Sequence, residues 1–273
     1  MANRKLTSQQ WESIEREEHD REYADNAPYL MDVGKALAYE DYCYKPGCRP
    51  DRGHRTRKAL DAIGLESLTG KVLLDIGCGS GKYSVLLGLL GARTFGFDIS
   101  PVGVDRAKAL AEMNGMSGKC DFSVQNAQEM SYPDDFFDII LMHEVLHHAI
   151  KYPNVKNEVL RVLKPGGKLV VSESLYANPF VNVGRMFTMH GKEAKGDVIL
   201  TLSDIEEFSE GFSSSSVELM SFLFMSKRIF RNYMHLKPVR DLMRLVKKAD
   251  DVLLRIFPAL QRYCGECVVV LIK

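Results

Sequence analysis

Residues Val72-Leu73-Leu74-Asp75-Ile76-Gly77-Cys78-Gly79-Ser80-Gly81 form the most informative stretch of this 273-residue sequence. The run 71–76 predicts a buried β-strand, and the three alternating glycines predict a tight turn that begins the next helix. Glycine accepts a positive φ and lets a ligand approach the backbone closely. A dinucleotide-binding turn has the pattern Gly-x-Gly-x-x-Gly, whereas this sequence has Lys82 at the sixth position. The stretch therefore disfavours a nicotinamide dinucleotide.

Strands and helices alternate after this turn. Strands are predicted over 94–98, 121–125, 136–142 and 168–174, and helices over 82–90, 101–113 and 154–163. Such alternation is typical of βαβ units and a parallel sheet. The remaining segments are predicted as helices over 12–22, 55–63 and 202–208, a strand over 217–224, one basic helix over 226–262 and a closing strand over 267–272.

The overall composition is that of an ordinary globular chain. It contains 36 Lys+Arg and 36 Asp+Glu, and 45% of its residues are hydrophobic. Zero net charge argues against a general nucleic-acid partner. No secretory signal is visible at the start, and no apolar run is long enough to be a transmembrane segment. We therefore expect a cytoplasmic protein, and the sequence leaves its oligomeric state open.

Polar residues follow each of the first three predicted strands. Asp75 would repel a pyrophosphate and attract a cationic amine. Asp98, at the end of the second strand, would accept hydrogen bonds from ribose hydroxyls, although an acidic residue there can also cap a helix. The amide of Asn126 would read an adenine edge, or serve only as a turn residue. Adenosine with a cationic amino-acid tail is S-adenosylmethionine.

With these residues in place, the sequence resembles the class I S-adenosylmethionine-dependent methyltransferases. It is most similar to the ubiquinone/menaquinone-biosynthesis and natural-product small-molecule group. The matching segments are 75–81, Asp98, Asn126-Ala127, 137–140, 146–148 and 160–167. The family often has Asp where this chain has Asn126.

The resemblance implies an α/β fold, with a Rossmann-like, seven-stranded and mostly parallel sheet whose last strand is antiparallel. It also implies three regions: a helical N-terminal lid over 1–67, a cofactor-binding core over 68–175, and acceptor-site insertions with the closing strands of the same domain over 176–273. The expected cofactor-binding residues are Asp75, Gly77, Cys78, Gly79, Gly81, Asp98, Ile99, Asn126, Ala127 and His143.

The catalytic residues that the resemblance implies follow the fourth and fifth strands. His148 is the preferred general base, with Glu173 as its partner and His147 in reserve, because imidazole suits the removal of a hydroxyl proton. The alternative is that the histidine pair only packs or contacts the cofactor. The segment 143–147 also matches the zinc motif His-Glu-x-x-His, but it directly leaves a strand, so we predict no metal site.

Two regions around this site have two interpretations each, and a third supplies candidate acceptor-pocket residues. The tyrosine-rich segment 23–44 covers the cofactor or packs as ordinary helix. The basic helix 226–262 docks on the core, or contacts an anionic or lipid-linked acceptor. Candidate acceptor-pocket residues are Asn178, Phe180, Arg185 and Met186. The sequence as a whole predicts S-adenosylmethionine-dependent methyl transfer to a small-molecule acceptor, with oxygen as the preferred acceptor atom. The alternatives are transfer to N, S or C on the same scaffold, or cofactor binding without catalysis.

Overall fold

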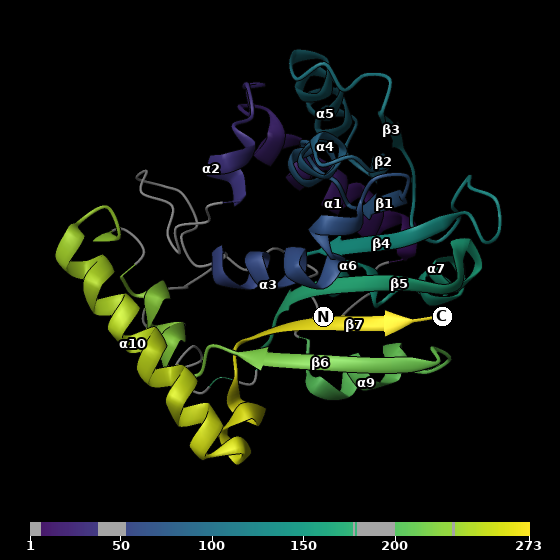
Figure 1. The fold of residues 1–273 in the computed structure, drawn as a ribbon. Coiled ribbons are helices and arrows are strands. Elements are labelled where there is room, and N and C mark those ends of the chain that lie inside the picture. The colour runs from purple at the N-terminus through teal and green to yellow at the C-terminus, as the bar shows by residue number, and fades with distance from the viewer. Residues whose placement is uncertain (1–6, 38–52, 177, 179–199, 231–232) are drawn as a thin grey trace, which may run out of the picture.

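A computed structural model describes residues 7–37, 53–176, 178, 200–230 and 233–273 (Figure 1). A seven-stranded sheet with the order β3-β2-β1-β4-β5-β7-β6 forms its centre. The strands are β1 Val72–Ile76, β2 Arg93–Asp98, β3 Cys120–Val124, β4 Phe137–His143, β5 Leu163–Ser174, β6 Ser214–Met220 and β7 Glu266–Ile272. Strands β1 to β5 pair in parallel, and β7 is antiparallel to both β5 and β6. The predicted mostly parallel sheet with an antiparallel last strand is confirmed.

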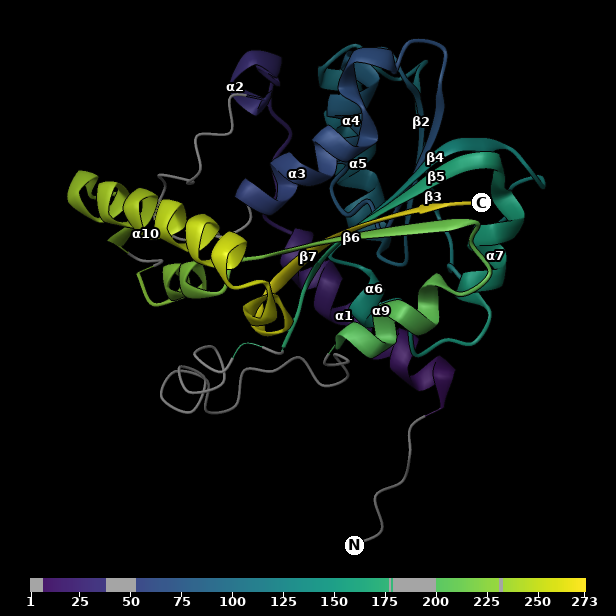
Figure 2. The ribbon, with the colours of Figure 1, turned by 60° about the horizontal axis from the view of Figure 1, so that its bottom comes forward.

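Helices cover both faces of this sheet. They are α1 Ser8–Tyr23, α2 Val33–Leu37, α3 Gly53–Ile63, α4 Lys82–Leu89, α5 Pro101–Met113, α6 Leu146–Ala149, α7 Val155–Val162, α9 Leu202–Ser209 and α10 Lys237–Ile256, with 3₁₀ turns η2 Leu65–Ser67, η3 Leu223–Arg228 and η5 Pro258–Tyr263. Figure 2 shows α3, α4 and α5 on one face and α1, α6, α7 and α9 on the other. The central strands are buried between these layers, which explains the nearly continuous apolar runs of β1 and β4.

The ends of two helices follow from local chemistry. Thr7 and Gln10 form a capping box at the start of α1, in which each side chain accepts a hydrogen bond from the other residue's backbone. Ser100 caps α5 by accepting from the Gly103 N–H at 2.9 Å, and Pro101 is the first helical residue. These caps fix α1 and α5, which pack against each other.

The predicted single helix over 226–262 is wrong. The described part of this span contains η3, α10 and η5 in place of one continuous helix. Proline lacks an N–H and cannot continue a helix, so Pro238 is accommodated at the beginning of α10 and Pro258 follows its end. The strand predicted over 217–224 is shifted as well, since β6 ends before Ser221, whose φ is 66°.

No helix within the described ranges is both long and apolar enough to cross a membrane.

Candidate active site

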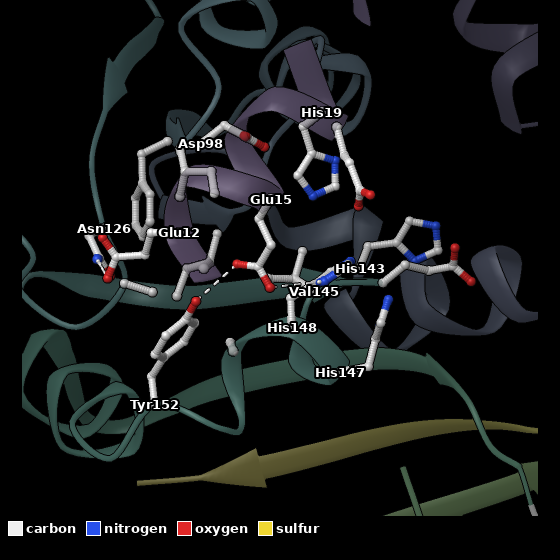
Figure 3. Close-up of a pocket in the computed structure, with 18 of the residues that line it drawn as sticks. Glu12, Glu15, His19, Asp98, Asn126, His143, Val145, His147, His148 and Tyr152 are labelled. Atoms are coloured by element: carbon white, nitrogen blue, oxygen red, sulfur yellow. Dashed lines mark hydrogen bonds and ion pairs between the residues drawn. The ribbon is translucent and has the colours of Figure 1, made fainter. Parts of the chain in front are cut away.

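A cavity of about 300 Å³ lies at the carboxyl ends of β1, β2 and β4 (Figure 3). The strand order reverses between β1 and β4, and ligands of open α/β sheets bind at such a reversal. Eight of the residues predicted as site residues line the cavity: Gly77, Asp98, Ile99, Asn126, Ala127, His143, His147 and His148. The structure therefore brings together residues at or just after the ends of β1, β2, β3 and β4.

The other five predicted site residues do not line the cavity. They are Asp75, Cys78, Gly79, Gly81 and Glu173. Asp75 is buried behind the glycine turn and accepts a hydrogen bond from Ser84 Oγ at 2.6 Å. Burial raises the pKa of Asp75 to about 7, with a smaller contribution from the negative charge of Asp98. In this structure Asp75 holds the turn to α4 and does not face the cavity.

The glycine turn depends on the absence of side chains. Gly77 has a φ of 68°, and a Cβ atom built on it would lie 2.4 Å from Val145 Cγ2. A Cβ atom on Gly79 would lie 2.8 Å from the Tyr23 hydroxyl oxygen. The turn is therefore held between the segment after β4 on one side and the end of α1 on the other.

Asp98 links the turn to the cavity wall. Its Oδ2 accepts from the Gly79 N–H and its Oδ1 from the Ser100 N–H, both at 2.9 Å. Burial raises the pKa of Asp98, although these backbone hydrogen bonds act in the opposite direction. Because Ser100 caps α5, Asp98 is not needed as the cap. Its carboxylate instead holds the backbone of the glycine turn and lines the cavity.

The two adjacent histidines of α6 have different carboxylate partners. His147 Nδ1 lies 3.0 Å from Glu173 Oε2, and the other oxygen of the fully buried Glu173 accepts from the Leu146 N–H at 2.6 Å. His148 Nδ1 lies 3.5 Å from Glu15 Oε1. The sequence predicts a pairing of Glu173 with His148, but the structure places His147 against Glu173, because neighbouring residues of a helix point about 100° apart.

Glu15 ties α1 to the segment that follows β4. Its carboxylate accepts hydrogen bonds from Tyr152 Oη at 3.1 Å and from Lys151 Nζ, and the dashed line in Figure 3 marks the bond to Tyr152. Burial raises the pKa of Glu15, but the hydrogen bonds to His148 and Lys151 outweigh burial and hold the pKa below its ordinary value. The charged form of Glu15 therefore stabilises the docked position of α1.

We expect Glu15→Gln to destabilise the protein at pH 7 by about 1.5–3 kcal/mol, the usual size for hydrogen bonds to a charged group. The pKa of Glu15 is lower in the folded than in the unfolded state, so its contribution is present above the ordinary value of 4.5 and is lost as the pH falls through the lowered pKa. Denaturant unfolding of wild type and variant at several pH values measures this difference. Glu17→Gln, on the exposed side of α1, is the matched control. A difference that does not depend on pH would contradict this account.

The acidic face of α1 is the main part of the site that the sequence analysis missed. Glu12, Glu15, Glu18, His19, Glu22 and Tyr23 all line the cavity. Glu12 Oε1 accepts from Asn126 Nδ2 at 2.7 Å and from Gln128 Nε2 at 3.1 Å. The sequence does contain a signal for this face, because residues three or four apart share one face of a helix, and Glu12, Glu15, Glu18 and Glu22 have this spacing. The sequence predicts a helix over 12–22, but the contact of this helix with the site depends on tertiary packing.

The geometry separates the two histidines of the His-Glu-x-x-His match. His143 belongs to β4 and His147 to α6, and between them Glu144 has a φ of 57°. The Glu144 carboxylate forms an ion pair with the buried guanidinium of Arg55. Within the described residues, no group of three or more His, Cys, Asp or Glu is arranged to hold a metal ion.

The candidate acceptor-pocket residues are mostly beyond what the structure describes. Asn178 is buried and donates from Nδ2 to the Phe222 carbonyl at 2.9 Å, and it does not line the cavity. Phe180, Arg185 and Met186 lie outside the described residues, as does the part of the tyrosine-rich segment after Leu37.

Comparison with known proteins shows what this chain is similar to. Residues 74–171 match the family described as a methyltransferase domain. Sterol 24-C-methyltransferase ERG6B of Gibberella zeae is 31% identical over 163 residues, which cover 59% of this chain and 43% of that protein. Ubiquinone biosynthesis O-methyltransferase of Methylobacterium sp. is 35% identical over 107 residues, which cover 39% of this chain and 42% of that protein.

A solved structure extends the likeness to nearly the whole chain. The [4+2]-cyclase SpnF has a TM-score of 0.63 and 21% identity, and the match covers 98% of this chain and 97% of that one. At this identity the likeness shows the fold alone, and one fold can carry many different activities.

The sheet order and the site at the strand reversal define a Rossmann-like α/β protein. Residues 74–171 match a methyltransferase domain, in agreement with the class I S-adenosylmethionine-dependent methyltransferases that the motifs resemble, and S-adenosylmethionine is the cofactor of that class. The chain spans less than half the length of these two curated relatives.

Proposed function

We propose that the protein transfers the methyl group of S-adenosylmethionine to a hydroxyl oxygen of a small-molecule acceptor, with His147 as general base. The observation that carries this proposal is the 3.0 Å contact between His147 Nδ1 and Glu173 Oε2 at the cavity wall. A carboxylate at Nδ1 favours the tautomer that carries its proton there, which leaves Nε2 able to accept a proton.

The cavity fits the cofactor by the chemistry of its wall. Asp98 would accept hydrogen bonds from the ribose hydroxyls, while Ile99 and Ala127 offer apolar contact to the adenine beside the amide of Asn126. The carboxylates of α1 favour a ligand with positive charge. When bound, S-adenosylmethionine supplies a methyl group on a positively charged sulfur.

The rest of the work falls to the chain. His147 would take the hydroxyl proton as the oxygen attacks, and Glu173 would stabilise the imidazolium that forms. Holding the acceptor oxygen in line with the methyl, with water excluded, supplies much of the rate enhancement. We further propose that residues 1–67 act as the lid, 68–175 as the cofactor-binding core, and 176–273 as the acceptor-site insertions and closing strands.

Transfer to carbon or nitrogen is the second candidate. Glu15, Glu18 and Glu22 would stabilise a cationic amine, or a carbon that becomes positive during transfer. The match to a sterol C-methyltransferase supports the carbon version.

Two measurements test the proposal. Calorimetry should detect binding of S-adenosylmethionine and S-adenosylhomocysteine and no binding of NAD. A transfer assay with methyl-tritiated cofactor should label an alkylated catechol but not its fully O-methylated ether, which is the matched control substrate.

Sterols and ethanolamines complete the panel of acceptors. Label on a sterol carbon or an amine, with none on the catechol, would favour the second candidate. Cofactor binding without labelling of any acceptor in the panel would count against methyl transfer to these classes. Absence of cofactor binding would refute the proposal.

A further inference from the structure

The span 229–257 contains most of the exposed large hydrophobic side chains of the described residues. Eight of the thirteen exposed large hydrophobic side chains of the described residues lie there. They are Ile229, Tyr233, Leu236, Leu242, Leu245, Val252, Ile256 and Phe257. Large exposed apolar patches are uncommon on monomeric proteins and mark interaction sites.

Helix α10 carries two apolar faces, of which only one is used inside the fold. Met243 and Leu254 are buried, and Met243 packs with Phe224 and Met234. Leu242, Leu245, Val252 and Ile256 follow the same helical spacing on an adjacent face and are 46–65% exposed. We call these four residues the outer stripe.

The polar side of α10 is cationic. The helix contains six Lys or Arg residues and three Asp residues. Asp250 is turned inward, where it accepts the backbone N–H groups of Phe222 and Leu223. The other two aspartates, Asp241 and Asp251, form ion pairs within the helix, so the net charge beside the outer stripe is positive.

The position of α10 relates it to the candidate active site. β7 begins beside α10 and runs away from it, and β5 is antiparallel to β7 (Figure 1). Helix α10 therefore lies on the side of the sheet where β5 ends, which is the edge that holds the cavity. A surface bound by α10 would face the same edge of the sheet as the site.

We propose that α10 docks on an anionic lipid surface, with the outer stripe inserted among the acyl chains and its cations against the phosphates. A helix with a broad apolar face and a basic polar face lies in the plane of a membrane interface. A second copy of the chain is the weaker alternative, because pairing the outer stripes would bring two cationic helices together. Docking would place the site beside a reservoir of apolar acceptors.

Vesicle co-sedimentation of the full chain tests this inference without any need for methyl transfer. We expect binding to phosphatidylcholine vesicles in which about a third of the lipid is anionic phosphatidylglycerol. Binding to pure phosphatidylcholine vesicles should be weak. Leu245→Asp with Val252→Asp should weaken binding at least ~10-fold through loss of buried apolar area. Lys248→Glu with Arg255→Glu should weaken it by roughly 5-fold or more per cation removed.

Met113→Asp is the matched control, since Met113 is a similarly exposed apolar residue on α5. It should bind vesicles like wild type, and thermal unfolding should show that all variants are folded. No binding by wild type, or equal binding by the double aspartate variant, would overturn the inference. So would a wild-type dimer that the double variant converts to a monomer while neither binds vesicles, because the outer stripe would then be a subunit interface.

Discussion

Replacing His147 with asparagine should lower the rate of transfer to a hydroxyl acceptor by about 10²–10⁴, the usual contribution of a general base. Affinity for S-adenosylhomocysteine should be nearly unchanged, because the proposed role of His147 concerns the acceptor. Single-turnover assays with labelled cofactor measure the rate, and calorimetry measures the affinity. The limb of the pH–rate profile that reports His147 titration should also disappear.

His148→Asn is the matched comparison, since His148 lies next to His147 on α6 and contacts Glu15 instead of Glu173. If His148→Asn shows the large loss and His147→Asn does not, the assignment of His148 as base in the sequence analysis is correct. Glu173→Gln tests the positioning role: it should lower the rate less than His147→Asn and shift the pH profile, because it removes the charge that stabilises the imidazolium.

Asp98→Ala should weaken binding of S-adenosylhomocysteine by about 1.5–3 kcal/mol, or roughly 10- to 150-fold. Isothermal calorimetry gives this value directly. The structure adds a second effect, since Asp98 accepts the backbone N–H groups of Gly79 and Ser100, so the variant should also lose stability. Asp98→Asn retains one carbonyl oxygen and should lose less cofactor affinity and less stability than Asp98→Ala.

Asp105→Ala, on the exposed side of α5, is the control and should leave affinity and stability unchanged. An Asp98→Ala variant that unfolds at a lower temperature but binds with wild-type affinity would show that Asp98 only organises the glycine turn.

Local chemistry made the core of the fold predictable. The run 72–76 had to be a buried strand because it is almost wholly apolar, and three alternating glycines leave few alternatives to a ligand-facing turn. Proline positions are equally informative: Pro238 and Pro258 mark the two ends of α10, where the sequence analysis predicts one basic helix over 226–262. Periodicity persists across a break in a helix, whereas a proline marks one.

The details of the site depended on tertiary contacts. Sequence placed His147, His148 and Glu173 at one edge of the sheet, but the choice between adjacent histidines depends on the rotation of the four-residue helix α6. The carboxylates of α1 lie in the helix that the sequence predicts over 12–22. Their contact with Asn126 and His148 joins residues more than a hundred positions apart in sequence, which no local pattern encodes.

The insertion of β7 between β5 and β6 has a consequence for the order in which the chain folds. Strands β1 to β5 can pair as soon as they have left the ribosome, but among the described strands β6 pairs only with β7 and is made before it. Until β7 is available, β5 and β6 each present an unpaired edge, and such edges invite pairing with other chains. Sheet completion is therefore a late, long-range step, and the interval between synthesis of β6 and of β7 is when a nascent chain of this protein most needs protection from aggregation.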